Sequence, residues 1–338
     1  MSNSANHDKE PMKRMSNEMS RRNVLKLAGI AVAAAAHRAL AETRPAFQPP
    51  SQPAGQLPKG KIGNLEISRL ILGTNHITFC MHSRGLRYVD DLARHYNTEQ
   101  KIMETFAAAE ANGVNAFITH SDPTIERIFR EYRDRHGGKM KWIVAPWNSA
   151  DGKATDVEGY IRIVPRLVDA GVDALYVPGM ISGDLVMHGK GALIGELLNV
   201  IAATGLPAGI SCHELDVVRF CEKEKLPVEF YIKTFHHLKY PNAPKPEDIK
   251  GPLAEVPGYW CSNPEETAEL MKCVAKPWIA FKVMAAGAIP PRSGFNYAFA
   301  SGADFILAGV FDFQMAEDAQ IVREVVAAHK TRLRPWRG

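Results

Sequence analysis

Histidines follow several short apolar runs of this 338-residue sequence, and each run has the length of a buried β-strand. Imidazoles that several strand ends bring together are good ligands for Zn, Mn, Fe, Co or Ni. Any one of these histidines, taken alone, is more commonly a hydrogen-bonded loop residue. Their repeated position nevertheless predicts a divalent transition-metal site, with the ligands His76, His120, His213 and His236.

Lys282 and Glu214 are the residues that we expect to carry out catalysis at this site. Lys282 lies in the apolar run 281–284, where a desolvated ammonium group beside imidazoles would have a lowered pKa. It could act as a general base or bind a substrate oxyanion. A structural ion pair explains the lysine equally well, and the sequence does not distinguish a Schiff-base role from these. Substrate would be bound by the neighbouring polar side chains Asn75, Asn148 and His237.

The elements that must position these side chains alternate along residues 59–338. Short β-type apolar runs predict strands at 68–72, 116–119, 142–145, 174–177, 208–211, 229–234, 279–283 and 305–308. Segments of helical periodicity predict helices at 99–112, 125–136, 159–170, 193–204, 217–225, 264–274, 293–300 and 315–329. Eight such repeats predict a (β/α)8 TIM barrel of class α/β, whose active site forms at the carboxyl ends of the strands. A doubly wound open sheet is the alternative, although no glycine-rich nucleotide-binding motif opens a repeat.

The first 41 residues have the features of an export signal. The sequence Ser20-Arg21-Arg22-Asn23-Val24-Leu25-Lys26 precedes an alanine-rich apolar segment, which is too short to span a bilayer and ends at Ala39-Leu40-Ala41. The paired arginines resemble the twin-arginine export motif. We therefore expect a twin-arginine signal peptide at 1–41, a linker at 42–58 and a barrel domain at 59–338.

Such a signal predicts a periplasmic or secreted protein that meets the twin-arginine export machinery transiently and keeps no stable membrane anchor. This machinery carries folded proteins, which strengthens the expectation of a bound metal. The alternatives are a disordered basic tail followed by an ordinary helix, and retention of the uncleaved segment as a tether.

Charge and cysteine content exclude other classes of protein. The formal net charge is +4, and residues 1–41 carry seven basic and three acidic side chains, so the rest of the chain is formally neutral. A neutral body offers no bulk attraction to nucleic acid or anionic lipid. The five cysteines form no C-x-x-C pair, so neither a disulfide framework nor a thiolate zinc site is indicated.

Segments along most of the predicted barrel resemble the aldo/keto reductase superfamily. The similar segments are 67–74, 113–117, 209–213, 282–287 and 304–310. The resemblance implies a (β/α)8 barrel that binds NADP(H) and reduces a carbonyl group through an Asp, Tyr, Lys and His tetrad.

The positions of that tetrad hold other residues in this sequence. Ile118 stands where the resemblance places the aspartate, and residues 119–124 contain no tyrosine. Segment 143–147 lacks the lysine, and segment 176–179 lacks the histidine. Because hydride chemistry of this kind needs the whole set, the sequence favours a different reaction on the same fold.

Three functions follow from these observations. The first is an exported enzyme doing metal-assisted lyase, hydratase or isomerase chemistry on a sugar-like carbonyl substrate, in which the metal holds the enolate oxygen. The alternative is an NADP(H)-dependent oxidoreductase with relocated catalytic groups. A further alternative is a periplasmic carbohydrate-binding protein.

Overall fold

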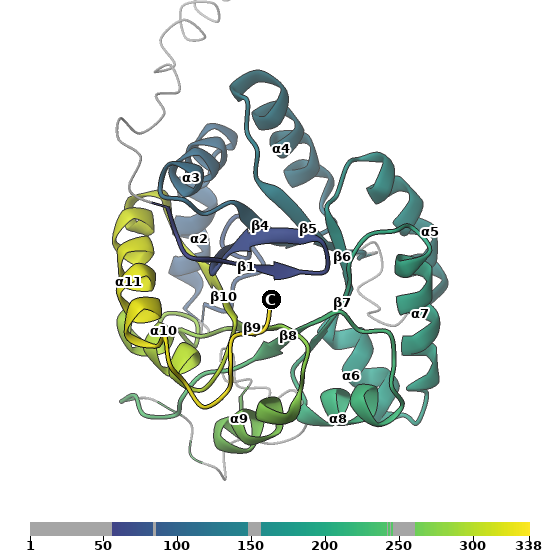
Figure 1. The fold of residues 1–338 in the computed structure, drawn as a ribbon. Helices are drawn as coiled ribbons and strands as arrows, with labels where there is room; N and C mark the ends of the chain where they lie inside the picture. Colours follow the sequence, from purple (N-terminus) through teal and green to yellow (C-terminus); the bar gives the residue numbers. More distant parts are fainter. Residues whose placement is uncertain (1–55, 84–85, 148–156, 242, 244, 246–260) are drawn as a thin grey trace, which may run out of the picture. The chain divides into compact units, whose positions relative to one another are not determined.

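The computed structural model describes residues 56–83, 86–147, 157–241, 243, 245 and 261–338. Within them, eight parallel strands form a closed barrel in the order β10-β3-β4-β5-β6-β7-β8-β9 (Figure 1). The strands are β3 (Leu70–Gly73), β4 (Ala116–His120), β5 (Lys141–Ala145), β6 (Ala174–Val177), β7 (Ala208–Cys212), β8 (Phe230–Thr234), β9 (Trp278–Phe281) and β10 (Phe305–Gly309). The predicted (β/α)8 barrel is confirmed. The predicted signal peptide and most of the predicted linker lie outside the described residues, so both stay predictions.

Helices surround the barrel, and those that the periodicity predicted are present within a few residues (Figure 1). Local signals explain their ends: the Asp122 side chain accepts hydrogen bonds from the first turn of α4, and Gly137 ends that helix in a left-handed conformation. The helices are α3 (Glu99–Ala111), α4 (Pro123–His136), α5 (Val157–Asp169), α7 (Ala192–Ala202), α8 (Leu215–Lys223), α9 (Pro264–Cys273), α10 (Pro291–Ala300) and α11 (Met315–Ala328).

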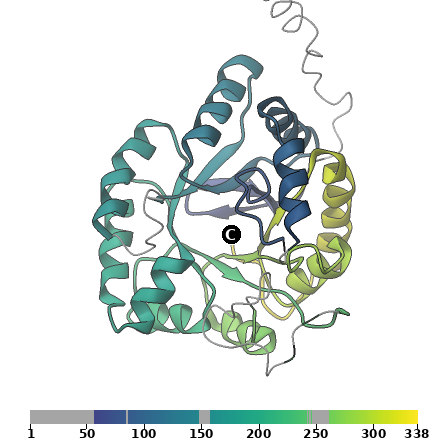
Figure 2. The ribbon, with the colours of Figure 1, turned by 180° about the vertical axis from the view of Figure 1, so that it is seen from behind.

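Among the described residues, three further helical elements follow barrel strands and interrupt the β/α repeats. Helix α2 (Arg87–Tyr96) follows β3, α6 (Gly179–Met187) follows β6, and the 3-10 helix η2 (Asp312–Gln314) follows β10. In the reverse view, α2 lies on the near face, away from β1 (Figure 2). Because all three follow the carboxyl ends of strands, they shape the end of the barrel where the predicted site residues lie.

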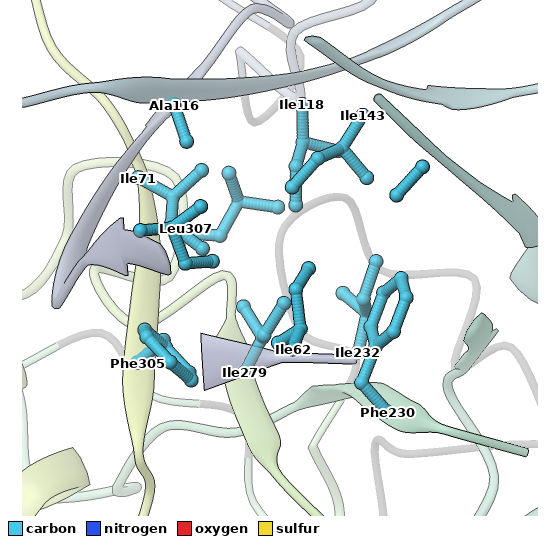
Figure 3. Close-up of a cluster of buried hydrophobic side chains, with 12 residues drawn as sticks. Ile62, Ile71, Ala116, Ile118, Ile143, Phe230, Ile232, Ile279, Phe305 and Leu307 are labelled. Carbon is cyan, nitrogen blue, oxygen red and sulfur yellow. The ribbon is translucent and has the colours of Figure 1, made fainter. Parts of the chain in front are cut away.

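A β-hairpin covers the other end of the barrel. Strands β1 (Lys59–Ile62) and β2 (Leu65–Ser68) pair antiparallel, and Gly63 between them has a φ of 54°. Ile62 of the hairpin packs with residues that begin barrel strands, including Phe230 and Phe305 (Figure 3). Within the described residues, the core of the barrel beneath the hairpin is therefore filled by apolar side chains.

The C-terminal segment is held at the same end, and the C-terminus lies over the barrel in Figure 1. Asp304, fully buried before β10, pairs with Arg332 at 2.8 Å and with Arg334 at 2.6 Å. The Arg69 guanidinium lies 4.1 Å from the ring centroid of Trp336. Buried charges are tolerated only when they are paired, so this network fixes the end of the chain.

Among the described residues, no helix is both long enough and apolar enough to cross a membrane.

Candidate active site

A cavity of about 510 Å³ opens at the carboxyl ends of the barrel strands. Its described walls come mainly from the ends of β3, β4, β9 and β10 and from the loops that follow β3 and β9. Among the described wall residues, Lys282 is the only Lys or Arg, and no Asp or Glu occurs. The titratable nitrogen groups around the cavity are therefore Lys282, His76, His82 and His120.

Lys282 follows directly after β9, at the cavity wall, as the sequence predicts for a catalytic residue. Its φ is 58°, in the left-handed region that L-residues adopt at a cost. Its Nζ is buried, 5.4 Å from the centroid of the Phe281 ring. Burial lowers the pKa of this amine well below its ordinary value of 10.5. The structure therefore places an amine of weakened basicity beside the cavity.

His82, which the sequence pattern does not place at the predicted site, also lines this cavity. It lies in the long connection between β3 and α2, which brings it toward the barrel. Burial lowers the pKa of His82 to about 3, and the charge of Lys282 acts in the same direction. His82 is the site residue that the sequence pattern missed, because only the path of this connection places it there.

His213 lies at the end of β7 and is held from several sides. Its Nδ1 shares a 2.7 Å hydrogen bond with the Thr234 hydroxyl, and its backbone carbonyl accepts a 2.7 Å bond from Lys233 Nζ. A Cβ at Gly179, the first residue of α6, would lie 3.2 Å from His213 Nε2. Burial lowers the pKa of His213 well below 6.5, and Lys282 and His82 contribute. The imidazole is therefore neutral at pH 7.

His76 lines the cavity from the loop after β3, and its ring contacts Phe311 edge-on at a centroid distance of 4.7 Å. Both ring nitrogens are buried. Burial lowers the pKa of His76 to about 4, against the opposing effects of the Val310 backbone and the Asp312 carboxylate. His76 is therefore a neutral wall residue.

His120 ends β4 at the cavity, with its Nε2 4.0 Å from the sulfur of Cys80. Burial lowers the pKa of His120, although Asp122 acts in the opposite direction. Asn75, predicted to bind substrate, also lines the cavity. Asn148, its predicted partner, lies outside the described residues.

His236 and His237 follow β8 but do not line this cavity. His236 Nδ1 bonds the backbone oxygen of His237 at 3.1 Å. His237 Nδ1 accepts a hydrogen bond from the Lys239 backbone, so its Nε2 carries the hydrogen and donates to the Ser293 hydroxyl at 2.9 Å. His237 instead lines a groove beside α10 and α11. The prediction that it binds substrate in the barrel mouth is therefore not supported.

Glu214 is directed away from the cavity. A Cβ at Gly183 in α6 would lie 2.4 Å from Glu214 Oε2, which places the carboxylate against that helix. Burial raises the pKa of Glu214. Since the carboxylate does not reach the cavity wall, the structure does not support its predicted catalytic role in the cavity.

The four predicted metal ligands are not gathered at one point. Within the described ranges, no group of three or more His, Cys, Asp or Glu side chains could hold a metal ion. The reason is the orientation of the rings. The His76 ring packs on Phe311, and the His213 ring is hydrogen-bonded to Thr234. The His236 ring is hydrogen-bonded to the backbone oxygen of His237. Strand ends share one end of the barrel, but their side chains point to different neighbours. The predicted metal centre is therefore corrected: these residues do not fit one.

Comparison with known proteins identifies the fold. No protein-family model matches the sequence, and no curated protein matches it. Among solved structures, an aldo-keto reductase from Pseudomonas aeruginosa, described there as putative, is similar with a TM-score of 0.51 and 16% identity, covering 80% of this chain and 94% of that one. An aldo-keto reductase from Bacillus halodurans in its holo form has a TM-score of 0.50 and 12% identity, covering 81% of this chain and 96% of that one. The chain therefore has the (β/α)8-barrel fold of the aldo-keto reductases.

Proposed function

We propose that this chain is an enzyme that moves a proton next to the carbonyl group of a small sugar-like compound, in a lyase, hydratase or isomerase reaction. The observation that carries the proposal is the position of Lys282. The Nζ of this half-buried lysine is buried at the wall of a cavity, in the end of the barrel where such folds place their active sites. An amine whose pKa is lowered by burial can take part in proton transfer there.

Neighbouring side chains supply the rest of the chemistry in this proposal. The neutral imidazole of His82 lines the same cavity and can accept or return a proton. Asn75, in the loop after β3, lines the cavity with a side-chain amide that can donate a hydrogen bond to the carbonyl oxygen. The proposal includes no metal ion, because the predicted ligands do not lie around one point in the described structure.

Exchange of protons for deuterium tests this function directly. The full chain is incubated with small keto acids and keto-sugars in D2O, and loss of the proton signal at the carbon beside the carbonyl is followed by NMR. We expect catalysed exchange with at least one compound, and at least about a hundredfold loss in Lys282→Met, because removal of a general acid or base typically costs this much.

Lys223→Met is the control, because Lys223 is a surface lysine whose side chain is 81% exposed. Equal exchange in wild type and Lys282→Met would contradict the proposed role of the lysine. Binding of keto-sugars without any exchange would instead favour the carbohydrate-binding alternative.

The second candidate is an NADP(H)-dependent oxidoreductase. It is favoured by the two structures compared above, since both are aldo-keto reductases, and this comparison supports it better than it supports a lyase. Barrels of this class often bind phosphate at the loops after the last two strands and at the N-terminus of a short helix.

The described residues after β10, in η2 and in the first turn of α11, do not fit a diphosphate. The Asp312 carboxylate in η2 is bonded to Tyr96 and Lys101, and Glu317 and Asp318 stand in the first turn of α11. Carboxylates at a helix N-terminus oppose a bound phosphate group. A thermal-shift titration separates the candidates: millimolar NADPH should leave the melting temperature unchanged under the first proposal, whereas a real cofactor site raises it.

We also propose export through the twin-arginine pathway. Its basis is the Arg21-Arg22 sequence ahead of an apolar segment. Replacing both arginines by lysine should leave the full-length precursor in the cytoplasm, which cell fractionation measures. Unchanged release of a shortened protein would contradict this proposal.

A further inference from the structure

We infer that Lys282 acts as a nucleophile, forming a covalent imine with the carbonyl carbon of a small carboxylate-bearing aldehyde or ketone held in the cavity at the barrel mouth. This inference rests on the proposed function and assigns a specific chemical step to the same site. Of the roles that the sequence leaves open for this lysine, the inference selects the Schiff-base role over a structural ion pair.

The backbone fixes the place of the amine. Lys282 is the first residue after β9, whose Phe281 pairs with Thr234 of β8 and Leu307 of β10. Ala285, Ala286 and Gly287 in the same loop also have positive φ values, between 44° and 84°. Non-glycine residues hold such angles only where the surrounding structure enforces them, and such strain concentrates at functional sites. The loop thus holds one lysine at a fixed point of the cavity wall.

The surroundings of Lys282 favour attack by the amine. Its Nζ is buried beside the Phe281 ring. The charge of Lys282 acts on two imidazoles with lowered pKa values, that of His82 at the cavity wall and that of His213, which does not line the cavity. Burial lowers the pKa of this amine well below 10.5, which raises the fraction of the amine that is unprotonated and able to attack a carbonyl carbon. A protonated surface lysine has no free lone pair for this attack.

The step balances without any further reagent. The nitrogen lone pair attacks the carbonyl carbon, the electron pair of the C=O bond moves to oxygen, and that oxygen takes a proton. The hydroxyl group of the resulting carbinolamine takes a second proton, from solvent, and leaves as water. This leaves a protonated C=N bond to Lys282, with one amine hydrogen still on the nitrogen. The protonated imine then draws electrons from the neighbouring C–H bond, so the protein itself supplies the electron sink for proton removal.

The wall of the cavity indicates the substrate class. The described wall contains three histidines and one lysine but no carboxylate, so a carboxylate on the substrate meets donors and no like charge. Its volume of about 510 Å³ suits a small molecule. Oxidised sugars and 2-oxo acids combine the carbonyl group with the carboxylate.

Reductive trapping tests the inference. The full chain is incubated at pH 7 with sodium cyanoborohydride and either pyruvate or dihydroxyacetone, and modified lysines are mapped by peptide mass spectrometry. Cyanoborohydride reduces an imine to a stable secondary amine. We expect pyruvate to label Lys282 at least about tenfold faster than Lys223, because Lys282 lies at the wall of the cavity that would hold pyruvate, whereas Lys223 is on the surface. Pyruvate should also label Lys282 faster than dihydroxyacetone does.

Each outcome bears on the inference. Labelling of Lys223 at or above the rate of Lys282 would overturn it, and equal labelling of Lys282 by both compounds would overturn the assigned substrate class. Because labelling is mapped on wild type, the test holds even where Lys282→Met fails to fold. Proton exchange without an adduct on Lys282 would leave the proposed function standing and remove the imine. An adduct without exchange would support the imine and remove the proposed function.

Discussion

Lys282 shows how a single residue acquires chemistry from its surroundings. The same side chain on a helix surface would stay protonated and solvated, whereas after β9 it is buried at a cavity wall and its pKa falls. The cost of burial is limited because the amine can lose its proton. Function here depends on the position of the residue, since its type alone allows an ion pair equally well.

Gly179 provides a test of the packing around His213. An added Cβ would lie 3.2 Å from both His213 Nε2 and Ser211 Oγ, so both must shift by a few tenths of an ångström. We expect Gly179→Ala to slow proton exchange by about tenfold, because small misplacements near a reacting group are costly. The melting temperature should change little.

The matched control is Gly195→Ala in α7, where the new Cβ would meet only the end of the Leu226 side chain, at 3.3 Å. Unaltered exchange in Gly179→Ala, or an equal loss in the control, would show that this contact does not position the site.

His76 makes stability depend on pH. Its folded pKa of about 4 lies below the ordinary 6.5, so the unfolded chain binds more protons between these values. The stabilisation is full above pH 6.5 and is lost as the pH falls through 4, by up to about 3 kcal/mol. We expect His76→Gln to lose less unfolding free energy than wild type between pH 7 and 4, in urea titrations.

His82 and His236 act in the same direction as His76, and Asp318, whose pKa is raised to about 6, acts in the opposite direction. Because wild type and His76→Gln both contain these residues, their contributions cancel in the difference between the two stability curves. Parallel curves would mean that His76 is not buried as described.

Helix α2 is the element that most affects access to the cavity. Its only buried residue is Ala93, yet Val89 lines the cavity and Tyr96 donates a 2.6 Å hydrogen bond to Asp312 in η2. We expect Tyr96→Phe to speed amide hydrogen exchange in α2 while the barrel strands keep their protection. The control is Tyr88→Phe, whose ring is 62% exposed. Equal exchange in both variants would show that this bond does not hold the helix.

Sequence patterns predict the repeating elements well and the inserted ones poorly. The strand at 174–177 and the start of α11 at Met315 agree with the structure, because apolar periodicity is a local property. The β1–β2 hairpin was overlooked, although its alternating pattern around Gly63-Asn64 is a usable signal. Helix α6 is short and almost uncharged, so its segment gives no amphipathic pattern.

The sequence predicts at which end of the barrel the candidate site lies, but not the directions of its side chains. Lys282, Asn75, His76 and His120 all line the cavity, because strand ends of a barrel must meet. The metal site was wrong because ring direction depends on tertiary neighbours such as Thr234, which strand-end spacing does not specify.

At the scale of the whole molecule, one buried carboxylate connects the chain's end to the barrel. Asp304 accepts from Arg332, Arg334 and the Trp278 backbone, and its exposed fraction is 0%. Removing one partner of a buried ion pair typically costs about 3–5 kcal/mol. We expect Asp304→Asn to lose about that much unfolding free energy in urea, with proton exchange retained in the folded fraction.

Asp216→Asn is the control, since Asp216 is a surface residue paired only with an exposed Arg219 in the described structure. A loss of unfolding free energy below about 1 kcal/mol in Asp304→Asn would show that the network contributes little to holding the end of the chain on the barrel.

The protonation state of Lys282 is the most direct test of the account. In protein labelled with 13C at lysine Cε, the Lys282 signal is identified by its disappearance in Lys282→Met and followed by NMR as the pH is raised. We expect this signal to titrate well below 10.5, the ordinary pKa of a lysine side chain. Titration together with the surface lysines would contradict the account, because a protonated amine could neither remove a proton nor form an imine at neutral pH.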